Sequence, residues 1–285
     1  MIARTIALLV LAGTLFVPGA GADKVTATEE IRRTLTYTDA SSPHSLLVDN
    51  LNGPITIEAY DGKDVRVVAR KTISAESAAK LDEAKAQITL DIREEPSKIT
   101  LYVDAPWRRS DGSTNYRGWR YHGYDVDVEF TIKVPARTAV YASTINRGEV
   151  IIRGIHGDYE VQNVNGGVEM TAIDGHGLAS TVNGPVHVAF AKNPGDDCMF
   201  RTVNGKVEVT FTGDLSAEIR LKTLNGKVYS DYDVEGVAPR SIAPERKHGR
   251  TVYRRGESFA VRAGAGGPTL SFDTLNGNIY ILKNK

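Results

Sequence analysis

The chain has 285 residues, of which 41% are hydrophobic and 25% are charged, as in a soluble globular protein with one large or two medium domains. Its 35 lysines and arginines balance its 35 aspartates and glutamates, so no net field draws it toward nucleic acid or anionic lipid. Cys198 is the single cysteine, which excludes an intramolecular disulfide.

The first 22 residues have the order of a secretory signal peptide. Arg4 precedes an apolar run over residues 6–17, and Ala20-Gly21-Ala22 resembles a cleavage site. The run has about 12 residues, whereas a bilayer-spanning helix needs about 20. We therefore expect cleavage near Ala22 and export to a periplasm, a cell surface or the medium. A buried core helix is the alternative.

Residues 23–135 are expected to form an N-terminal β region with one short helix, continuous with the rest of the chain. Polar and apolar residues alternate in three stretches, which predicts strands. These stretches are 46–71 (two strands around Asn52-Gly53), 87–103 (two strands around Glu95-Pro96) and 125–135 (one strand ending at Pro135). Residues 74–86 are rich in helix formers and predict the helix.

An Asn-Gly doublet recurs along the chain. It occurs at Asn52, Asn165, Asn183, Asn204, Asn225 and Asn276, and Asn146 adds a variant with one residue inserted. Consecutive spacings from Asn146 to Asn225 are 19, 18, 21 and 21 residues, and a fixed period near 20 indicates a repeat architecture. Residues 136–285 are therefore predicted to be a β-repeat region. Because the motif occurs seven times, we interpret it as a structural turn rather than a catalytic element.

Each unit is expected to contain a strand, a loose turn, a second strand and the Asn-Gly turn, with the doublet at positive φ. In a β-solenoid-like stack, the doublets are corners, the Asn side chains form a hydrogen-bonded ladder, and the apolar residue before each Asn points inward. In an antiparallel β-meander or sandwich, the doublets close hairpins. A hairpin would place Val203 opposite Lys206 on the polar face, so the solenoid-like stack is favoured.

The segment 104–125 interrupts the pattern with aromatic and basic residues. It contains Trp107, Arg108, Arg109, Tyr116, Trp119, Arg120 and Tyr121. Tryptophan, tyrosine and arginine are enriched at binding hot spots and suit sugar stacking or an anionic polymer. These seven residues are the candidate binding site. The alternative is a hairpin tip whose rings pack on the sheet.

A second interruption, residues 239–255, is strongly basic and is expected to be a solvated loop or a contact for anionic polymers. The chain has no nucleophile elbow, no zinc-protease motif and no phosphate loop. His156 and His176 lie 20 residues apart, at nearly equivalent positions of the repeat. With Asp158 or Asp174 they are candidate ligands for a divalent metal ion. Because their Gly-rich contexts are typical of turns, no metal, cofactor or catalytic residue is predicted.

The run VEFTIKVPARTAVYASTINRGEVIIRGIHGDYEVQNVNGGVEMTAIDGHGLASTVNGPVHV, with the closing GGPTLSFDTLNGNIYILK, resembles a bacterial adhesin-like family with β-strand repeats, domain of unknown function 4097. The resemblance covers about residues 44–285. It implies an exported β-solenoid-like protein used in adhesion or envelope association, and it transfers no catalytic residues.

The sequence thus predicts an exported, non-enzymatic β-repeat protein with an adhesin-like binding or scaffold role in the bacterial cell envelope. The alternatives are a polysaccharide-active β-helix enzyme and a purely structural envelope protein. The expected partners are an envelope glycan or anionic polymer, and a second copy pairing through exposed strand edges. Neither nucleic acid nor a transmembrane span is expected.

Overall fold

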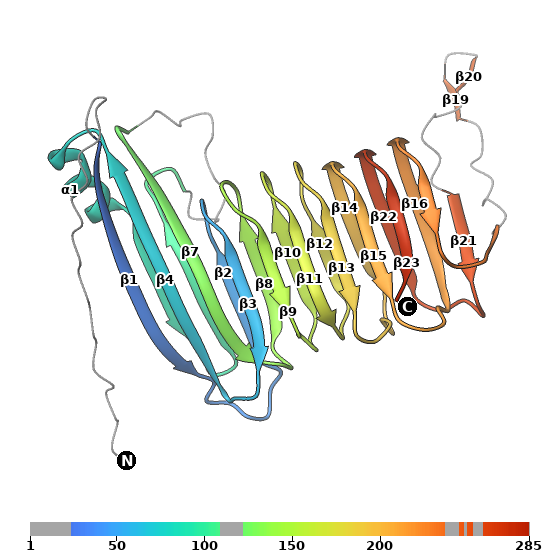
Figure 1. The fold of residues 1–285 in the computed structure, drawn as a ribbon, viewed down its shortest axis with the longest axis horizontal. Coiled ribbons are helices and arrows are strands. Elements are labelled where there is room, and N and C mark those ends of the chain that lie inside the picture. Colours follow the sequence, from blue (N-terminus) through green and yellow to red (C-terminus); the bar gives the residue numbers. More distant parts are fainter. Residues whose placement is uncertain (1–23, 109–121, 237–244, 248–249, 253–258, 285) are drawn as a thin grey trace.

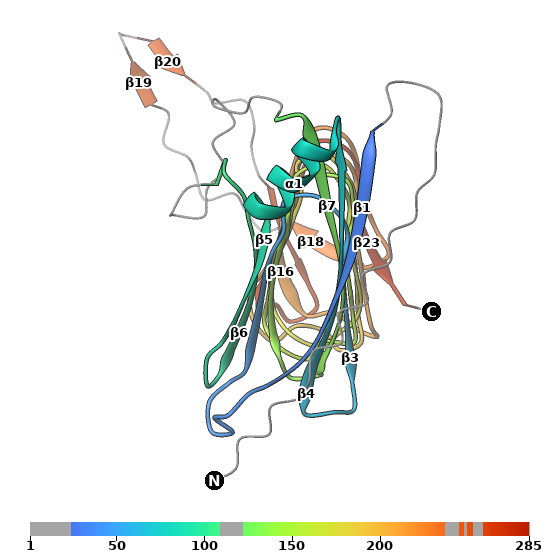
Figure 2. The same cartoon turned by 90° about the vertical axis from the view of Figure 1, so that its left-hand side faces the viewer.

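The computed structural model describes residues 24–108, 122–236, 245–247, 250–252 and 259–284. These residues form β-strands and one helix, and nearly all the strands belong to two large mixed sheets (Figure 1). Figure 2 shows the two sheets as facing layers. The predicted all-β class is confirmed, and the two-layer layout is one that a sandwich also has.

The 10-stranded sheet has the order β1-β4-β7-β3-β9-β11-β13-β15-β23-β17, and the 11-stranded sheet has the order β18-β21-β16-β22-β14-β12-β10-β8-β2-β6-β5. The elements are β1 (Val25–Thr36), β2 (Ser45–Asp49), β3 (Ile55–Tyr60), β4 (Asp64–Ala75), α1 (Ala78–Gln87), β5 (Thr89–Glu94), β6 (Lys98–Asp104), β7 (Tyr124–Pro135), β8 (Ala139–Thr144), β9 (Val150–Arg153), β10 (Tyr159–Asn163), β11 (Val168–Ile173), β12 (Gly177–Ser180), β13 (Val186–Phe190), β14 (Cys198–Asn204), β15 (Val207–Phe211), β16 (Ala217–Asn225), β17 (Val228–Ser230), β18 (Val234–Gly236), β19 (Glu245–Lys247), β20 (Arg250–Val252), β21 (Phe259–Ala263), β22 (Thr269–Asn276) and β23 (Ile279–Lys283). The short strands β19 and β20 pair with each other in a separate hairpin.

In the middle of the molecule, successive repeat units pair in parallel. β14 ends at Asn204 and β15 begins at Val207, yet the two strands belong to different sheets. Within each sheet, β12 pairs in parallel with β10 and β14, and β13 pairs in parallel with β11 and β15. The doublet therefore joins one layer to the other, and the strands that flank it do not form a hairpin.

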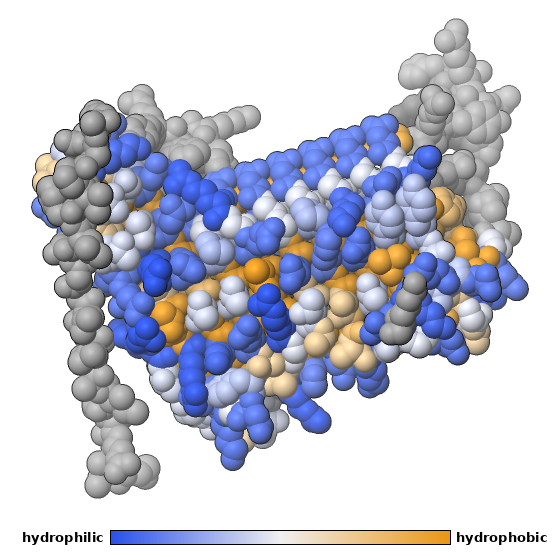
Figure 3. All heavy atoms as spheres, in the orientation of Figure 1, coloured by the Kyte–Doolittle hydropathy of each residue, from blue (hydrophilic) through white to orange (hydrophobic). Residues whose placement is uncertain are grey.

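The seven repeat asparagines form the predicted side-chain ladder. In every step, one Nδ2 donates to the Oδ1 of the neighbouring Asn: Asn146 to Asn52 (3.1 Å), Asn165 to Asn146 (2.7 Å), Asn183 to Asn165 (2.8 Å), Asn204 to Asn183 (2.8 Å), Asn276 to Asn204 (2.7 Å) and Asn225 to Asn276 (2.8 Å). Figure 3 shows a straight row of hydrophilic residues along the upper edge of the stack.

The expectation of positive φ at the doublets is wrong at all but one. Among the repeat glycines, only Gly53 lies in the left-handed region, with φ of 111°, and none of the repeat asparagines does. Glycine is needed because adjacent units approach closely. A Cβ on Gly205 would overlap the carbonyl oxygen of Gly184, and one on Gly277 would overlap that of Gly205. Tertiary packing, rather than local turn geometry, selects glycine here.

A second polar ladder lies just inside the first, two residues before each repeat Asn. Each member donates a side-chain hydrogen bond to a repeat-glycine carbonyl, and the members are Asn50, Thr144, Asn163, Thr181, Thr202, Thr223 and Thr274. Thr202 Oγ1, for example, donates to Gly184 O at 2.9 Å. These bonds satisfy carbonyls that would otherwise be buried without a partner.

The prediction that the residue before each Asn points inward fails along much of the stack. Leu51 is buried and Ile145 packs against the core, but Val182, Leu275 and Leu224 are 38%, 43% and 60% exposed. Side chains alternate along a strand, so the inward-facing Thr or Asn two residues before the doublet sends the next side chain outward.

The last unit of the chain does not lie at the end of the stack. β22 is inserted between β14 and β16, and β23 is inserted between β15 and β17. The core continues through this insertion, because the rings of Phe200 and Phe272 have centroids 5.2 Å apart. Phe190 of the other sheet meets Phe200 edge to face at 6.1 Å. One core thus runs between the two layers and through the inserted unit.

Antiparallel strands close both ends of the parallel stack. At the N-terminal end, β1 pairs with β4, β4 with β7, and β5 with β6; at the other end, β21 pairs with β16 and β18. The helix α1 packs beside the first group, burying Leu81 and Ala84, and its N-cap Ser77 accepts a hydrogen bond from Lys80 N.

The structure confirms the predicted helix, the strands around Glu95-Pro96 and the long strand that ends at Pro135. The range 46–71 holds parts of three strands instead of two, and residues 74–75 belong to β4 rather than to the helix. The predicted signal peptide, 1–22, lies outside the described residues, as does most of the basic segment 239–255. Within the described part, no helix is both long and apolar enough to span a membrane.

Candidate functional site

One row of side chains crosses the outer face of the 11-stranded sheet. It contains Tyr141, Glu160, Leu178, Met199, Ser271 and Arg220, which are Cα partners on the neighbouring strands β8, β10, β12, β14, β22 and β16. Every member stands five residues before a repeat Asn. Because strands are spaced about 4.8 Å apart, this row runs roughly 24 Å along the stack.

This row forms the floor of an open hollow of about 440 Å³. Its lining residues are Tyr141, Asp158, Tyr159, Glu160, His176, Gly177, Leu178, Asp197, Cys198, Met199, Arg220, Thr269 and Ser271. Ser271 is the small member of the row and lies between the larger Met199 and Arg220. Gly177 has φ of 147°, and a Cβ there would overlap the Tyr159 carbonyl oxygen. We call this hollow the groove.

The exposed side chains give the groove a mixed apolar and acidic character. Met199 and Tyr141 are 44% and 39% exposed, so both present apolar surface to the solvent. Glu160 is also exposed, and Arg220 at the far end is paired with Glu218 (3.1 Å). The groove therefore offers apolar contact along its floor, and its only unshared charges in this row are acidic.

One wall carries a histidine between two carboxyl groups. His176 Nδ1 lies 3.0 Å from Asp158 Oδ1 and 4.0 Å from Asp196 Oδ2, and all three side chains are well exposed. The neighbouring acid, Asp197, has a structural role, since its Oδ1 accepts the Thr269 backbone N–H at the start of β22. Across the described residues, no three His, Cys, Asp or Glu side chains are grouped so that they could hold a metal ion.

Cys198 belongs to the lining of the groove, but its side chain is almost fully buried beneath the surface. It is 3% exposed, and the Tyr159 hydroxyl and the Asp196 carbonyl oxygen each lie 3.7 Å from its sulfur. Burial raises the pKa of the Cys198 thiol, which reduces the thiolate fraction at neutral pH. The side chain is therefore a packed core residue and is not suited to act as a nucleophile.

We expect iodoacetamide to alkylate Cys198 at pH 8 at least about tenfold more slowly in the native protein than in denaturant, because burial both shields the sulfur and raises the pKa of the thiol, which lowers the thiolate fraction. Mass spectrometry of the carbamidomethylated protein over time measures both rates. Equal rates with and without denaturant would contradict the buried position.

The candidate binding residues of the segment 104–125 fall largely outside the described residues: Arg109, Tyr116, Trp119, Arg120 and Tyr121 are not described. Trp107 is partly buried against the core, and its ring centroid lies 5.4 Å from that of His122.

Arg108 is anchored to the sheet below it. Its two terminal nitrogens donate to the Asp49 carboxylate at 2.8 and 2.9 Å, and its guanidinium lies 4.4 Å from the centre of the Tyr102 ring. Its side chain is only 2% exposed. Arg108 therefore holds the start of this segment in place, and its charge is already used within the protein.

The seven repeat asparagines are together, as the ladder, on the edge of the stack, and none of them lines the groove. Within the described part of the chain, His156 and His176 belong to no group of side chains that could hold a metal ion, and His176 faces Asp158 and Asp196. Sequence reasoning missed the groove residues. Their shared position, five residues before each repeat Asn, was visible in the sequence and could have pointed to them.

The fold and the groove define a class: an all-β repeat protein with two facing sheets and an open surface groove. No family model and no curated protein sequence matches the chain. The solved structures it resembles include a "putative cell adhesion protein" of Clostridium sporogenes (11% identity, TM-score 0.43, covering 90% of this chain and 100% of that one) and a "putative adhesin" of Bacteroides fragilis (13%, 0.35, 90% and 97%). A "putative lipid binding protein" of Parabacteroides distasonis is also similar (11%, 0.27, 90% and 97%).

Proposed function

We propose that this protein is an exported, non-enzymatic binding scaffold of the bacterial cell envelope, built as a solenoid-like coil, and that the groove holds an extended glycan. The groove with its row of six side chains is the observation that carries this proposal. The signal-peptide-like start of the chain supports export.

The shape of the groove suits a chain-like ligand. It is open to solvent, and its floor continues across six strands, so a polymer could lie along the stack without entering a closed cavity. The Tyr141 ring and the Leu178 and Met199 side chains can contact the apolar faces of sugar rings, and the polar neighbours can bind hydroxyl groups. The two hydrogen-bonded side-chain ladders at the ends of the same strands hold this floor rigid, and a rigid site lowers the entropy cost of binding.

The charges favour a neutral or amine-bearing glycan over an anionic polymer. Asp158, Glu160 and Asp196 surround the groove, whereas Arg220 is already paired with Glu218. A polyanion would meet several carboxylates at close range, and such like-charge contacts cost binding free energy. Of the two ligand classes predicted from the sequence, the groove therefore supports the glycan.

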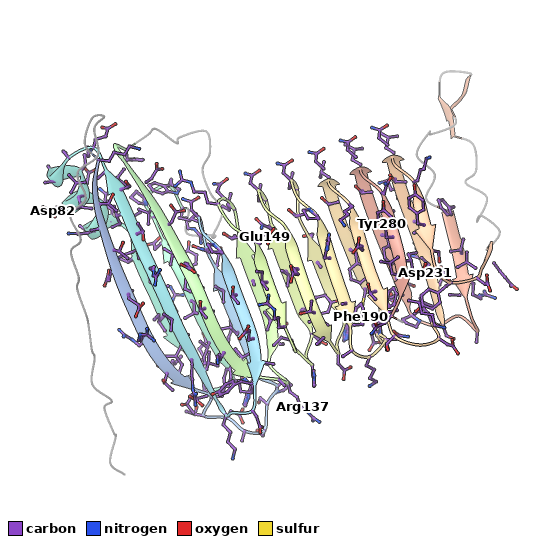
Figure 4. All side chains as sticks on the ribbon, in the orientation of Figure 1. Asp82, Arg137, Glu149, Phe190, Asp231 and Tyr280 are labelled. Atoms are coloured by element: carbon purple, nitrogen blue, oxygen red, sulfur yellow. The ribbon has the colours of Figure 1, made fainter. Side chains whose placement is uncertain are left out.

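The proposal is tested by titrating the mature protein with chitosan oligosaccharides, neutral β-linked oligosaccharides and polygalacturonate, using isothermal calorimetry. Binding of the first or second class is expected. The double variant Tyr141→Ala/Met199→Ala should weaken that binding at least about tenfold, equivalent to about 1.4 kcal/mol. Tyr229→Ala is the matched control, because Tyr229 is 44% exposed on the outer face of the other sheet, stacked on Tyr280 (Figure 4).

Equal binding by the double variant and by the control would remove the groove as the site. The variant Trp119→Ala tests the segment 104–125 in the same titrations, and a loss confined to that variant would move the site there. Binding of polygalacturonate alone would contradict the charge argument. If no polymer binds, the purely structural reading replaces this one.

The acids beside His176 favour one alternative, a polysaccharide-cleaving enzyme, because paired carboxyl groups perform glycoside hydrolysis. Chromatography of each bound oligosaccharide after overnight incubation distinguishes the two functions. The binding scaffold leaves the oligosaccharides intact. New shorter products that disappear in Asp158→Asn/Asp196→Asn would establish the enzyme instead.

A further inference from the structure

The most unusual edge of the molecule is β1. This strand of 12 residues lies at the end of the 10-stranded sheet, and among the described strands it pairs along its whole length with β4 alone (Figure 1). An average strand has about 5–6 residues, so β1 presents a long row of backbone groups on its other side. Proteins usually shorten, bend or cover such an edge, because it is a template for another strand.

The β1 sequence, Val-Thr-Ala-Thr-Glu-Glu-Ile-Arg-Arg-Thr-Leu-Thr, is self-complementary about Ile31. Two glutamates precede Ile31 and two arginines follow it, and threonines flank both pairs. Read in opposite directions, two copies of this strand match acid with base and threonine with threonine. Among the described edge strands, β5 has only the centre of this pattern, Asp91-Ile92-Arg93, without the second charge pair and the flanking threonines.

We propose that two copies of this chain pair antiparallel through β1, with the two Ile31 residues on the symmetry axis. Glu30 then lies opposite the Arg32 of the second copy, and Glu29 opposite its Arg33, and each pair occurs twice by symmetry. Thr28 meets Thr34 of the other copy in the same register. Such opposite-charge and threonine pairs each contribute about 0.2–1 kcal/mol, beyond the backbone bonds.

The charged side chains of β1 favour the register centred on Ile31 over the two neighbouring registers. A two-fold axis perpendicular to the sheet keeps the inner faces of both copies on the same side. Such an axis lies midway between the two copies of one residue, so the allowed registers differ from one another by steps of two residues. Centring on Glu30 places two glutamates opposite each other, and centring on Arg32 does the same for two arginines. Like charges directly opposite are destabilising. The charges on this edge therefore select one partner orientation.

The side chains needed for pairing are in position in the single chain. Glu30 and Arg32 point to the outer face, where they contact each other at 2.7 Å, and the Arg32 side chain is 66% exposed. On the inner face, Glu29 contacts Lys71 at 2.9 Å. Pairing would exchange the Glu30–Arg32 contact within one strand for two contacts between strands. It needs no rearrangement of the core.

The pairing goes beyond the proposed function and does not depend on it. It would join the two 10-stranded sheets into one continuous sheet. The axis is perpendicular to that sheet, so both 11-stranded sheets, with their grooves, would face the same side. Two grooves on one side could bind a single polymer together, with a gain in avidity.

Analytical ultracentrifugation of the full chain tests the proposal. We expect a dimer at about 50 µM protein, as for a dissociation constant of about 10 µM or lower. Glu30→Arg and Arg32→Glu should each weaken dimerisation at least about tenfold, since each places like charges opposite one another in the pairing register. An equimolar mixture of the two variants should restore the dimer, because every one of these contacts becomes an opposite-charge pair.

Arg93→Glu is the matched control. Arg93 lies on β5, the edge strand of the other sheet at the same end, and pairs with Asp91 two residues before it, as Arg32 does with Glu30. This variant should dimerise like the wild type. Circular dichroism melting curves verify that the variants remain folded. A wild type that stays monomeric at about 500 µM, or a dimer that neither charge reversal weakens, would overturn the proposal.

Discussion

Truncation after Pro268 is expected to prevent the C-terminal half of the stack from folding, although it removes only β22, β23, the two residues between them and the last two residues. These strands lie inside the sheets, so their loss separates β14 from β16 and β15 from β17. Leu270, Phe272, Ile279 and Ile281 are at most 1% exposed. Burying four such side chains contributes roughly 6–12 kcal/mol, comparable with the whole stability of a typical domain.

Hydrogen exchange with mass spectrometry measures this effect strand by strand. Protection should be lost from β14 to β17 in the truncated chain and retained in β4, β7 and β3, which lie far from the gap. Truncation after Lys283 is the control, because it removes only Asn284 and Lys285 and leaves both strands in place. Full protection of β16 without the last unit would show that the order of strands in the sheets is wrong.

Gly277→Ala is expected to lower the free energy of unfolding by roughly 2–4 kcal/mol, which is large for the addition of one methyl group. The new Cβ would overlap the carbonyl oxygen of Gly205 in the adjacent unit. That oxygen also accepts the Thr274 hydroxyl, at 3.0 Å, so it cannot move without breaking a buried hydrogen bond. Urea denaturation monitored by circular dichroism gives the free energy.

Gly195→Ala provides the matched comparison. Nothing lies within 4 Å of a Cβ built on Gly195, and its φ is outside the left-handed region. The free energy of unfolding should therefore change by no more than about 0.5 kcal/mol. If both variants lose the same stability, the effect arises from the conformational freedom of glycine rather than from the close approach of the units.

The spacing of the Asn-Gly doublets was enough to predict the class, the period and the side-chain ladder. Each doublet carries the same local pattern, and the ladder follows once equivalent units stack. The place of the last unit could not be predicted in this way. The 50 residues between Asn225 and Asn276 contain no Asn-Gly doublet, so no local sequence pattern predicts the return of the chain or the insertion of β22 beside β14.

Two incorrect predictions from the sequence have the same physical origin. Positive φ at Gly205 and an inward-facing Leu224 are both what an isolated turn would favour. In the stack, contacts with the adjacent unit decide instead: a carbonyl oxygen fills the space beside Gly205, and the inward-facing Thr223 sends Leu224 to the surface. The groove could not be predicted for a related reason. It is formed by ordinary residues that become neighbours only when the units stack, and the binding role of the segment 104–125 stays a prediction.

The ladder also affects how the protein ages chemically. An asparagine followed by glycine is prone to deamidation, because the glycine nitrogen can attack the side-chain amide carbon and close a cyclic imide. Here the Gly184 and Gly205 N–H groups donate to the carbonyl oxygens of Asn204 and Asn276, both at 3.0 Å, while neighbouring amides hold the Asn183 and Asn204 side chains. The ring cannot close until the stack opens, so folding preserves the very bonds that a free peptide of this sequence would lose first.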